Sequence, residues 1–342
     1  MIQWYYLYMS KYFLRFISCL AVCFLALGCD QTRLMTGATM GTTYHIKVIT
    51  SDQVEALQRE VDSELARINE MMSTYIADSD LSLFNGSPIG EPYAVPEELI
   101  SLLGRSAQIS DSTGGAFDVT VGPLVTLWGF GAEGMPLQIP DEQQIEHALS
   151  RVGMQHLNIG RSSLTRSVEL YVDLSAIAKG YAVDRVSELL SKEGFPRHMV
   201  EIGGELKALG NNDRNAPWMI AIERPELLER SIFRTLPVRD LGLATSGDYR
   251  NYREVAGKRY SHLIDPRLGR PISHALASVT VLHESTATAD ALATALNVMS
   301  PEQGMAYAIE QSLAVLFIIK DGDGFIERRS PALDAYLGQY DD

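Results

Sequence analysis

Two oxygen-bearing side chains lie four residues apart in the stretch 285–296, in which most of the other residues are small. In a helix, Asp290 and Thr294 would share one face, about 6 Å apart along the axis. A carboxylate and a hydroxyl are the hard oxygen ligands that Mg²⁺ prefers, and this ion keeps positions open for phosphate. The spacing therefore indicates part of a magnesium site. An alanine-rich core helix with a capping Asp would show the same pattern.

A second candidate for chemistry is the pair His262 and Asp265 in the segment 260–269. Histidine moves a proton near neutral pH, and a nearby carboxylate can orient its ring. The pair is therefore a candidate acid–base couple. The alternative is an ordinary surface histidine beside a turn, because Pro266 and Gly269 follow closely.

Two further segments combine glycine with polar side chains. In 114–125, Gly114 and Gly115 would let the backbone approach a ligand closely, and Asp118 stands between apolar residues. In 173–182, a strand is expected to end where a helix begins, so N–H groups there could meet a phosphate or a metal. Lys179 adds a positive charge to this segment. It is not a P-loop, because the G-x-x-x-x-G-K-[ST] pattern does not occur in the sequence.

The elements that must position these residues follow from hydrophobic periodicity. Apolar residues at three- and four-residue steps predict a helix over 53–72, and similar patterns predict helices over 96–111, 140–152, 181–192, 287–299 and 301–312. Alternation or short apolar runs predict strands over 43–50, 170–174, 199–202, 218–222, 278–282 and 314–319. The Gly-rich region 114–136 is expected to be an ordered loop. Because helices and strands do not alternate strictly, the sequence predicts an α+β fold.

The N-terminus has the features of an export signal. Lys11 and Arg15 precede an apolar run over 16–27, which is shorter than the roughly twenty residues of a membrane-spanning helix. The run closes on small residues before Cys29, which predicts a signal peptide over 1–28, a lipidated tether over 29–38 and one domain over 39–342. An ordinary signal peptide and an uncleaved anchor are the alternatives, and Met9 is an alternative start. Asp30 favours retention in the inner membrane over the outer one.

Charge and cysteine content limit the partners that the protein can have and the way in which its fold is stabilised. The formal net charge is −14 and the chain has no basic run, which argues against nucleic acid as a partner. An anionic ligand would therefore need a local cation, and a divalent metal is the simplest one. Cys19 and Cys23 lie in the leader, so Cys29 is the one cysteine of the expected mature chain. An exported domain without disulfides must be stabilised by its core.

Seven short motifs, in one order from about residue 39 to about 320, resemble the FAD:protein FMN transferases, which are the ApbE-type lipoproteins. They are Met40-Gly41-Thr42, Gly115-Ala116-Phe117-Asp118, the segment 173–181, Ile202-Gly203-Gly204-Glu205, Ser246-Gly247-Asp248-Tyr249-Arg250, Ser261-His262-Leu263-Ile264-Asp265-Pro266 and Ala289-Asp290-Ala291-Leu292-Ala293-Thr294. Each motif alone is modest, but seven in order behind a lipoprotein signal are specific.

The resemblance implies a two-lobed, T-fold-like α+β domain with FAD in the cleft and Mg²⁺ bound by Asp290, Thr294 and the backbone carbonyl of Ala176. It implies that His262 deprotonates the acceptor, and we expect Asp265 to orient His262. The residues that it places around FAD are Met40, Tyr75, Ala116, Phe117, Asp118, Asp173, Lys179 and Ile264. Acidic residues also occur in the family at the position of Lys179, so its role need not be charge pairing.

The implied reaction transfers FMN from FAD to a Thr or Ser hydroxyl and releases AMP. The implied acceptors are exported domains of membrane redox complexes, of the Na⁺-translocating NADH:quinone reductase or Rnf type. The implied location is the periplasmic side of the inner membrane, through lipidated Cys29. Three alternatives remain open, namely an FAD pyrophosphatase, a flavin-binding lipoprotein without catalysis and a solute-binding lipoprotein of a transporter.

Overall fold

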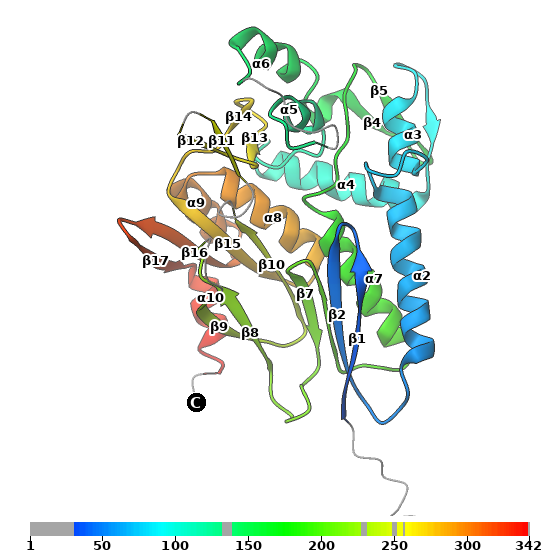
Figure 1. The fold of residues 1–342 in the computed structure, drawn as a ribbon, viewed down its shortest axis with the longest axis vertical. Helices are drawn as coiled ribbons and strands as arrows, with labels where there is room; N and C mark the ends of the chain where they lie inside the picture. The colour runs from blue at the N-terminus through cyan, green and yellow to red at the C-terminus, as the bar shows by residue number, and fades with distance from the viewer. Residues whose placement is uncertain (1–30, 132–138, 227–230, 248–251, 256, 341–342) are drawn as a thin grey trace, which may run out of the picture.

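An eight-stranded, fully antiparallel sheet forms the centre of the lower part of the molecule in Figure 1. The fold is known from a computed structural model, which describes residues 31–131, 139–226, 231–247, 252–255 and 257–340. In sheet order, the strands are β1 (Gln31–Thr39), β2 (Thr42–Thr50), β6 (His198–Ile202), β7 (Glu205–Leu209), β10 (Leu241–Gly247), β15 (Leu276–His283), β16 (Ala314–Asp321) and β17 (Gly324–Arg329).

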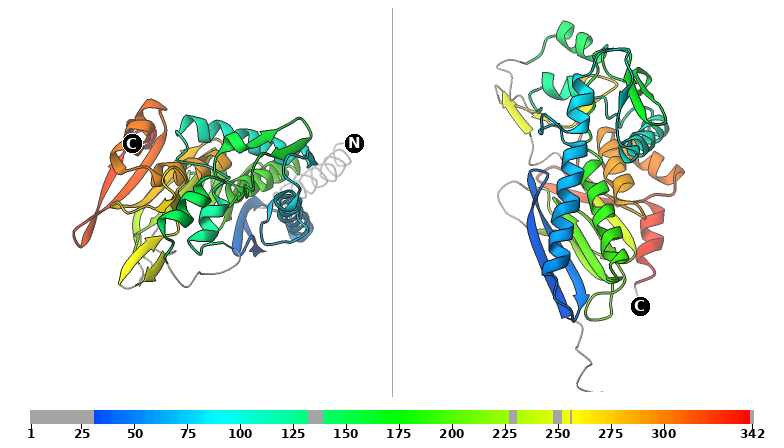
Figure 2. Two further views of the ribbon diagram at one scale, coloured as in Figure 1. Left: turned by 90° about the horizontal axis from the view of Figure 1, so that it is seen from above. Right: turned by 90° about the vertical axis from the view of Figure 1, so that its right-hand side faces the viewer.

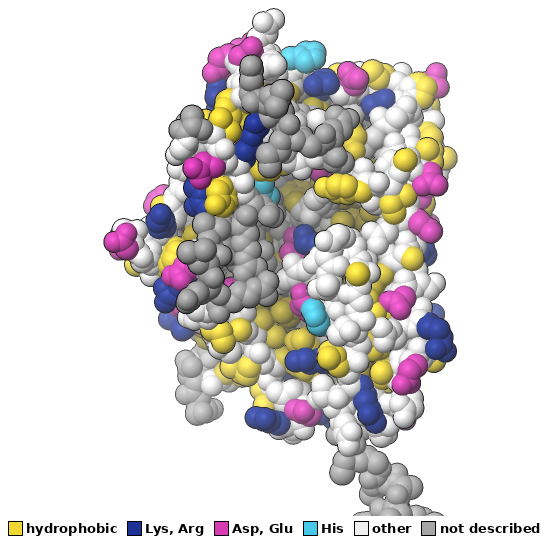
Figure 3. Space-filling view, in the orientation of Figure 1, with side chains coloured by type: hydrophobic (Ala, Val, Ile, Leu, Met, Phe, Trp, Pro, Cys, Tyr) yellow, Lys and Arg dark blue, Asp and Glu magenta, His cyan; other side chains and the backbone are white. Residues whose placement is uncertain are grey.

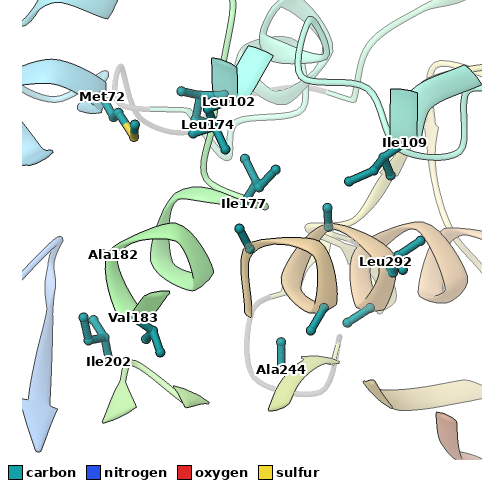
Figure 4. Close-up of a cluster of buried hydrophobic side chains, with 14 of the residues drawn as sticks. Met72, Leu102, Ile109, Leu174, Ile177, Ala182, Val183, Ile202, Ala244 and Leu292 are labelled. Atoms are coloured by element: carbon teal, nitrogen blue, oxygen red, sulfur yellow. The ribbon is translucent and has the colours of Figure 1, made fainter. Parts of the chain in front are cut away.

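Helices cover one face of this sheet and form the main core with it. Helices α7 (Ala178–Lys192) and α8 (Thr286–Val298) pack on the strands, and α2 (Glu55–Met72) lies beside α7 (Figure 2). Figure 4 shows buried side chains of this core, with Val183 of α7 beside Ile202 of β6 and Leu292 of α8 on the opposite side of the view. Helix α8 is buried on nearly every side, which explains its small residues.

The opposite face of the sheet has its own smaller core. The hairpin of β8 (Trp218–Glu223) and β9 (Ile232–Val238) covers it together with α10 (Pro331–Leu337). Trp218, Leu316 and Leu333 are buried there. Because apolar residues point to both faces, central strands such as β16 are continuous apolar runs rather than alternating ones.

The upper part of the molecule is a second, less regular lobe. It contains α3 (Asp80–Gly86), α4 (Glu97–Ser112), α5 (Gly122–Leu127), α6 (Glu142–Leu149) and the 3₁₀ turn η1 (Met154–His156). Its short strands are β3 (Tyr93–Ala94), β4 (Leu157–Ile159), β5 (Ser163–Arg166), β11 (Tyr252–Val255), β12 (Lys258–Ser261), β13 (Ile264–Asp265) and β14 (Arg270–Pro271). A separate apolar cluster joins α5, α6 and β13 around Leu124, Trp128 and Ile145.

The predicted α+β class is confirmed, and most predicted helices occur with shifted ends. Helix α6 is shorter than the predicted 140–152, and α7 begins before residue 181. The region 114–136 is not all loop, since it contains α5. Its residues 132–138 lie outside the described part of the chain.

The prediction of a strand over 170–174 was wrong. This segment has one isolated bridge, between Val121 and Tyr171. The Asn85 side chain bonds both the N–H and the C=O of Val172, at 2.8 and 2.9 Å. A buried side-chain amide therefore satisfies backbone groups that a neighbouring strand would otherwise pair.

The prediction of a tether was wrong for residues 31–38. They belong to β1, which pairs with β2 from Gln31↔Thr50 to Thr39↔Thr42. Met35 in this strand is 1% exposed, so the segment joins the core. Residues 1–30, with the expected signal peptide and Cys29, lie outside the described residues. Across the described residues, no helix is both long and apolar enough to span a bilayer.

Candidate active site

A cavity of about 730 Å³ lies between α8 with its sheet and the upper lobe. Figure 3 shows the hollow at the middle of one face, with acidic and basic side chains inside it. Its walls come from the loops before α5 and α7, the turn between β6 and β7, the end of β10, β13 and α8. The volume falls within the range of about 300–1,000 Å³ that small-molecule sites occupy.

The structure brings most of the predicted site residues into this one cavity. Those that line it are Tyr75, Ala116, Phe117, Asp118, Asp173, Ala176, Lys179, His262, Ile264, Asp290 and Thr294. They come from segments that are far apart in the chain, so their convergence is a property of the fold.

Asp290 and Thr294 lie on the face of α8 that lines the cavity. Asp290 is 5% exposed, and its Oδ2 accepts a hydrogen bond of 3.0 Å from the N–H of Gly180. Among the described residues, its Oδ1 and the hydroxyl of Thr294 have no hydrogen-bond partner. The helix therefore presents two hard oxygens to the cavity at the spacing that the sequence predicts.

Lys179 and Glu205 form an ion pair beside Asp290. The Lys179 Nζ lies 3.7 Å from Glu205 Oε1 and donates a hydrogen bond of 3.3 Å to the carbonyl of Ser175. Burial opposes the charge of Lys179, but the attraction of Glu205 and Asp290 outweighs it and raises the pKa of the lysine. Burial, and then the charge of Asp290, raise the pKa of Glu205 against the opposing effect of Lys179. Burial likewise raises the pKa of Asp290.

The cavity is acidic before any ligand enters. Among the described lining residues, Lys179 is the one lysine or arginine, and the carboxylates are Asp118, Asp173, Glu205 and Asp290. Oε2 of Glu205 is buried without a hydrogen-bond partner. These carboxylates would repel an anionic ligand such as a pyrophosphate unless a cation accompanied it.

These observations fit a magnesium ion at Asp290 and Thr294. The described residues contain no group of three or more His, Cys, Asp or Glu side chains arranged to bind a metal. Hydroxyl, backbone or phosphate oxygens would have to complete the coordination, as Mg²⁺ commonly requires. Ala176 also lines the cavity, and its carbonyl is the predicted third protein ligand.

The loop before α7 is held by Asp173. Its Oδ1 accepts hydrogen bonds from the N–H and the hydroxyl of Ser175, at 2.8 and 2.5 Å. This local turn places Ala176 at the cavity wall just before α7 begins. Asp118 acts in a similar way on its own loop, where its Oδ1 accepts from the N–H and hydroxyl of Thr120. Burial raises the pKa of Asp118.

Aromatic side chains frame the other end of the cavity. The ring of His262 meets Phe130 edge to face, with centroids 6.4 Å apart. Tyr75 is 73% exposed although it lines the cavity. An exposed aromatic ring at the mouth of a cavity is suited to cover a planar ligand.

Two predicted residues do not line this cavity among the described residues. Met40 lies in the turn between β1 and β2, with a φ of 49°. Both oxygens of Asp265 accept hydrogen bonds from the side chain of Arg267, at 2.9 and 2.7 Å. Asp265 also accepts from the N–H of Arg267. These bonds give Asp265 a role in the turn after β13, and its expected role of orienting His262 stays a prediction.

Sequence reasoning missed several lining residues. Glu205 follows the Gly203-Gly204 turn, and its motif was noted without a role for the carboxylate. Thr245, Ser246 and Gly247 line the cavity from the end of β10, and the motif that begins at Ser246 likewise carried no assigned role. The available local signal was a group of small polar residues at the end of an apolar strand, which alone is also typical of a plain turn.

Comparison with known proteins identifies the class of this fold and site. Residues 40–317 match the ApbE family. The FAD:protein FMN transferase of Vibrio cholerae is 45% identical over 94% of this chain and 98% of its own. That of Escherichia coli is 38% identical over 94% of this chain and 97% of its own.

Solved structures agree with the sequence comparison. The flavin transferase ApbE from Vibrio cholerae has a TM-score of 0.83 and 44% identity, and covers 90% of this chain and 99% of its own. The apo flavinyl transferase ApbE of Pseudomonas stutzeri has a TM-score of 0.84 and 41% identity, with 90% and 98% coverage. The fold is that of a flavin transferase. The chain belongs to the ApbE family.

Proposed function

We propose that this protein transfers the FMN part of FAD to a Ser or Thr hydroxyl of an exported acceptor protein and releases AMP. Flavin transfer itself follows from membership of the ApbE family and from relatives named FAD:protein FMN transferase. The observation that carries the finer proposal is the pair of unpartnered oxygens on Asp290 and Thr294 in an acidic cavity.

The chemistry is a phosphoryl transfer, so alignment and charge dominate its barrier. The acceptor oxygen forms a bond to the FMN phosphorus, and the P–O bond to AMP breaks. The electron pair of that bond leaves with AMP. The hydroxyl proton must leave the acceptor oxygen at the same site.

Mg²⁺ bound by Asp290, Thr294 and the Ala176 carbonyl would neutralise pyrophosphate charge and stabilise the leaving phosphate. The side chains of the protein contribute a further positive charge and the positions of the ligands. Lys179 adds a fixed positive charge next to Asp290, held by Glu205 and the carbonyl of Ser175. The Asp173 turn holds the loop that brings Ala176 to the cavity wall.

His262 is the candidate base for the acceptor hydroxyl. It lines the same cavity as Asp290 but lies toward the upper lobe, beside Phe130. A base that comes from a different part of the cavity wall than the metal ligands suits an in-line displacement, in which the attacking and leaving oxygens lie on opposite sides of phosphorus. Tyr75 at the mouth is placed to cover the flavin ring.

Chromatography of the soluble products separates transfer from hydrolysis. The protein from residue 31 onward would be incubated with FAD and Mg²⁺, with and without a flavin-accepting domain of a membrane redox complex. Transfer predicts that AMP appears only with the acceptor and that free FMN does not accompany it. Equal AMP and free FMN without an acceptor would instead identify an FAD pyrophosphatase. Unchanged FAD that stays bound would identify a flavin-binding protein.

We also propose that the protein works on the periplasmic side of the inner membrane, anchored by a lipid on Cys29. The leader sequence supports this location. Because β1 begins at Gln31, such an anchor would hold the sheet edge close to the bilayer, where acceptor domains of membrane complexes also lie. Mass spectrometry of the membrane-bound protein should find Cys29 as its first residue, carrying the added mass of a lipid. An N-terminus that keeps the leader, or an unmodified Cys29, contradicts the lipid anchor.

A further inference from the structure

Asp184 is a buried carboxylate outside the cavity that binds the first turn of α8. It lies in α7, 8% exposed, and accepts four hydrogen bonds. Oδ1 accepts from the N–H of Thr286 at 3.0 Å and from Nζ of Lys207 at 2.9 Å. Oδ2 accepts from the hydroxyl of Ser285 at 2.9 Å and from the N–H of Ala287 at 3.1 Å.

The carboxylate completes the N-terminus of α8 from a different helix. The first N–H groups of a helix have no partner within it, and a negative charge is favourable there. The capping residue of α8, Ser285, bonds the N–H of Thr288 and leaves the two earlier N–H groups to Asp184. Lys207 from β7 balances the charge of Asp184. Asp184 therefore joins α7, α8 and the sheet at one point.

A second bond lies one helical turn away from this point. Gly180, four residues before Asp184 on α7, donates its N–H to Asp290, four residues after Thr286 on α8. The contacts of Asp184 and the Gly180–Asp290 bond lie at two points along the helix pair. Together they restrain both the translation of α8 along α7 and its rotation about its own axis. The proposed metal ligands are divided between these same elements, with Ala176 before α7 and Asp290 and Thr294 on α8.

We propose that Asp184 is a positioning residue for the metal site, because it sets the register between the two elements that supply the ligands. The inference rests on the metal site of the proposed function. Without Asp184, α8 remains packed by its apolar sides. It loses the bonds that hold α8, with Asp290 and Thr294, in register with α7 and the Ala176 segment before it. Residues that orient metal ligands typically affect metal affinity by about 10- to 100-fold.

The test uses Mn²⁺ alone as a probe, because its free form is counted directly by electron paramagnetic resonance. Asp184→Asn keeps the shape of the side chain and removes its charge. We expect its Mn²⁺ dissociation constant to rise about tenfold or more at a temperature at which the variant is fully folded. Ser330→Ala is the matched control, because Ser330 is a fully buried cap of α10 far along the sheet. It should lower the melting temperature and leave Mn²⁺ affinity unchanged.

Asp184→Glu is the second variant and decides the question if Asp184→Asn does not fold. It keeps the charge opposite Lys207 but moves the carboxylate by one methylene. Its Mn²⁺ affinity should therefore lie between those of the wild type and Asp184→Asn. Wild-type affinity in a folded Asp184 variant overturns the inference and makes Asp184 purely structural. Wild-type protein that does not bind Mn²⁺, or an Asp290→Asn variant that binds it equally well, overturns the proposed metal site and this inference with it.

Discussion

The backbone N–H of Gly180 donates a hydrogen bond of 3.0 Å to the carboxylate of Asp290, and no larger residue fits between them. A Cβ on Gly180 would lie 2.4 Å from the carbonyl oxygen of Thr286 and 2.8 Å from Cβ of Asp290. The close approach of α7 and α8 thus depends on a glycine at this position, as does the orientation of the proposed metal ligand.

Gly180→Ala should therefore lower stability and impair metal binding together. We expect the free energy of unfolding to fall by about 1–3 kcal/mol, because the extra methyl overpacks a helix contact. The matched control is Gly104→Ala in α4, where a Cβ would have no atom within 4 Å. It should be neutral or stabilising, by up to about 1 kcal/mol. Urea unfolding measures the stability change of each variant, and Mn²⁺ titration measures metal binding. Equal changes in stability for the two substitutions would contradict the packing argument.

The hydroxyl of Thr294 is expected to be essential for metal affinity, whereas its methyl group is not. Thr294→Val keeps the shape and removes the hydroxyl, and Thr294→Ser does the reverse. The Mg²⁺ concentration for half-maximal transfer should rise at least about tenfold in the valine variant and stay near wild type in the serine variant. A titration of initial rate against Mg²⁺ checks this. Similar Mg²⁺ requirements in both variants would remove Thr294 from the metal site.

His262→Ala should retain FAD binding and lose transfer. Loss of a general base lowers rates by about 10²- to 10⁴-fold, and the flavin has other contacts in the cavity. Quenching of FAD fluorescence measures binding, and AMP release in the presence of acceptor measures the rate. His45→Ala serves as a control, because the ring of this histidine contacts the Glu201 carboxylate on the sheet, 2.7 Å from Nδ1 to Oε2, and does not line the cavity. A loss of FAD binding in His262→Ala would show a structural role instead.

Acid should destabilise the fold in part through His198. This side chain is fully buried, with Nδ1 2.7 Å from the Phe195 carbonyl and Nε2 2.8 Å from the Ser187 hydroxyl. Burial lowers the pKa of His198, and the charge of Lys207 acts in the same direction. The unfolded chain therefore binds a proton more readily, so stability should fall as pH decreases from about 6.5 toward the lower pKa of the folded state.

His198→Gln should flatten this part of the pH profile, measured as the free energy of unfolding in urea between pH 5 and 8. Part of the slope should remain, because burial also lowers the pKa of His283. His147→Gln is the control, since His147 is exposed on α6 and should leave the slope unchanged. An unaltered slope in His198→Gln would contradict the assignment.

The periodic elements were predictable from sequence, and the segments held by side chains were not. The apolar steps in α2 and the alternation of Tyr44, Ile46 and Val48 in β2 correspond to buried faces in the structure. Residues 170–174 have the apolar character of a strand, but both backbone groups of Val172 bond to the side chain of the distant Asn85. No local pattern can reveal a partner 87 residues away.

The site shows the same division between local and distant information. Asp290 and Thr294 could be paired because helical spacing alone places them together. Asp265 was assigned to His262 by proximity in sequence, yet its oxygens bond to Arg267, which is closer still in the chain. Glu205 was recognised only within a motif, because its burial beside Lys179 depends on how the β6–β7 turn packs against α7.

The intact mass of an acceptor domain tests the central claim most directly. The protein, FAD and Mg²⁺ would be incubated with a flavin-accepting domain, with and without a chelator, and in parallel with Asp290→Asn. Our account predicts a mass gain of one FMN residue on the acceptor, abolished by the chelator and by the substitution. An acceptor of unchanged mass, while AMP and free FMN accumulate, would contradict protein flavin transfer.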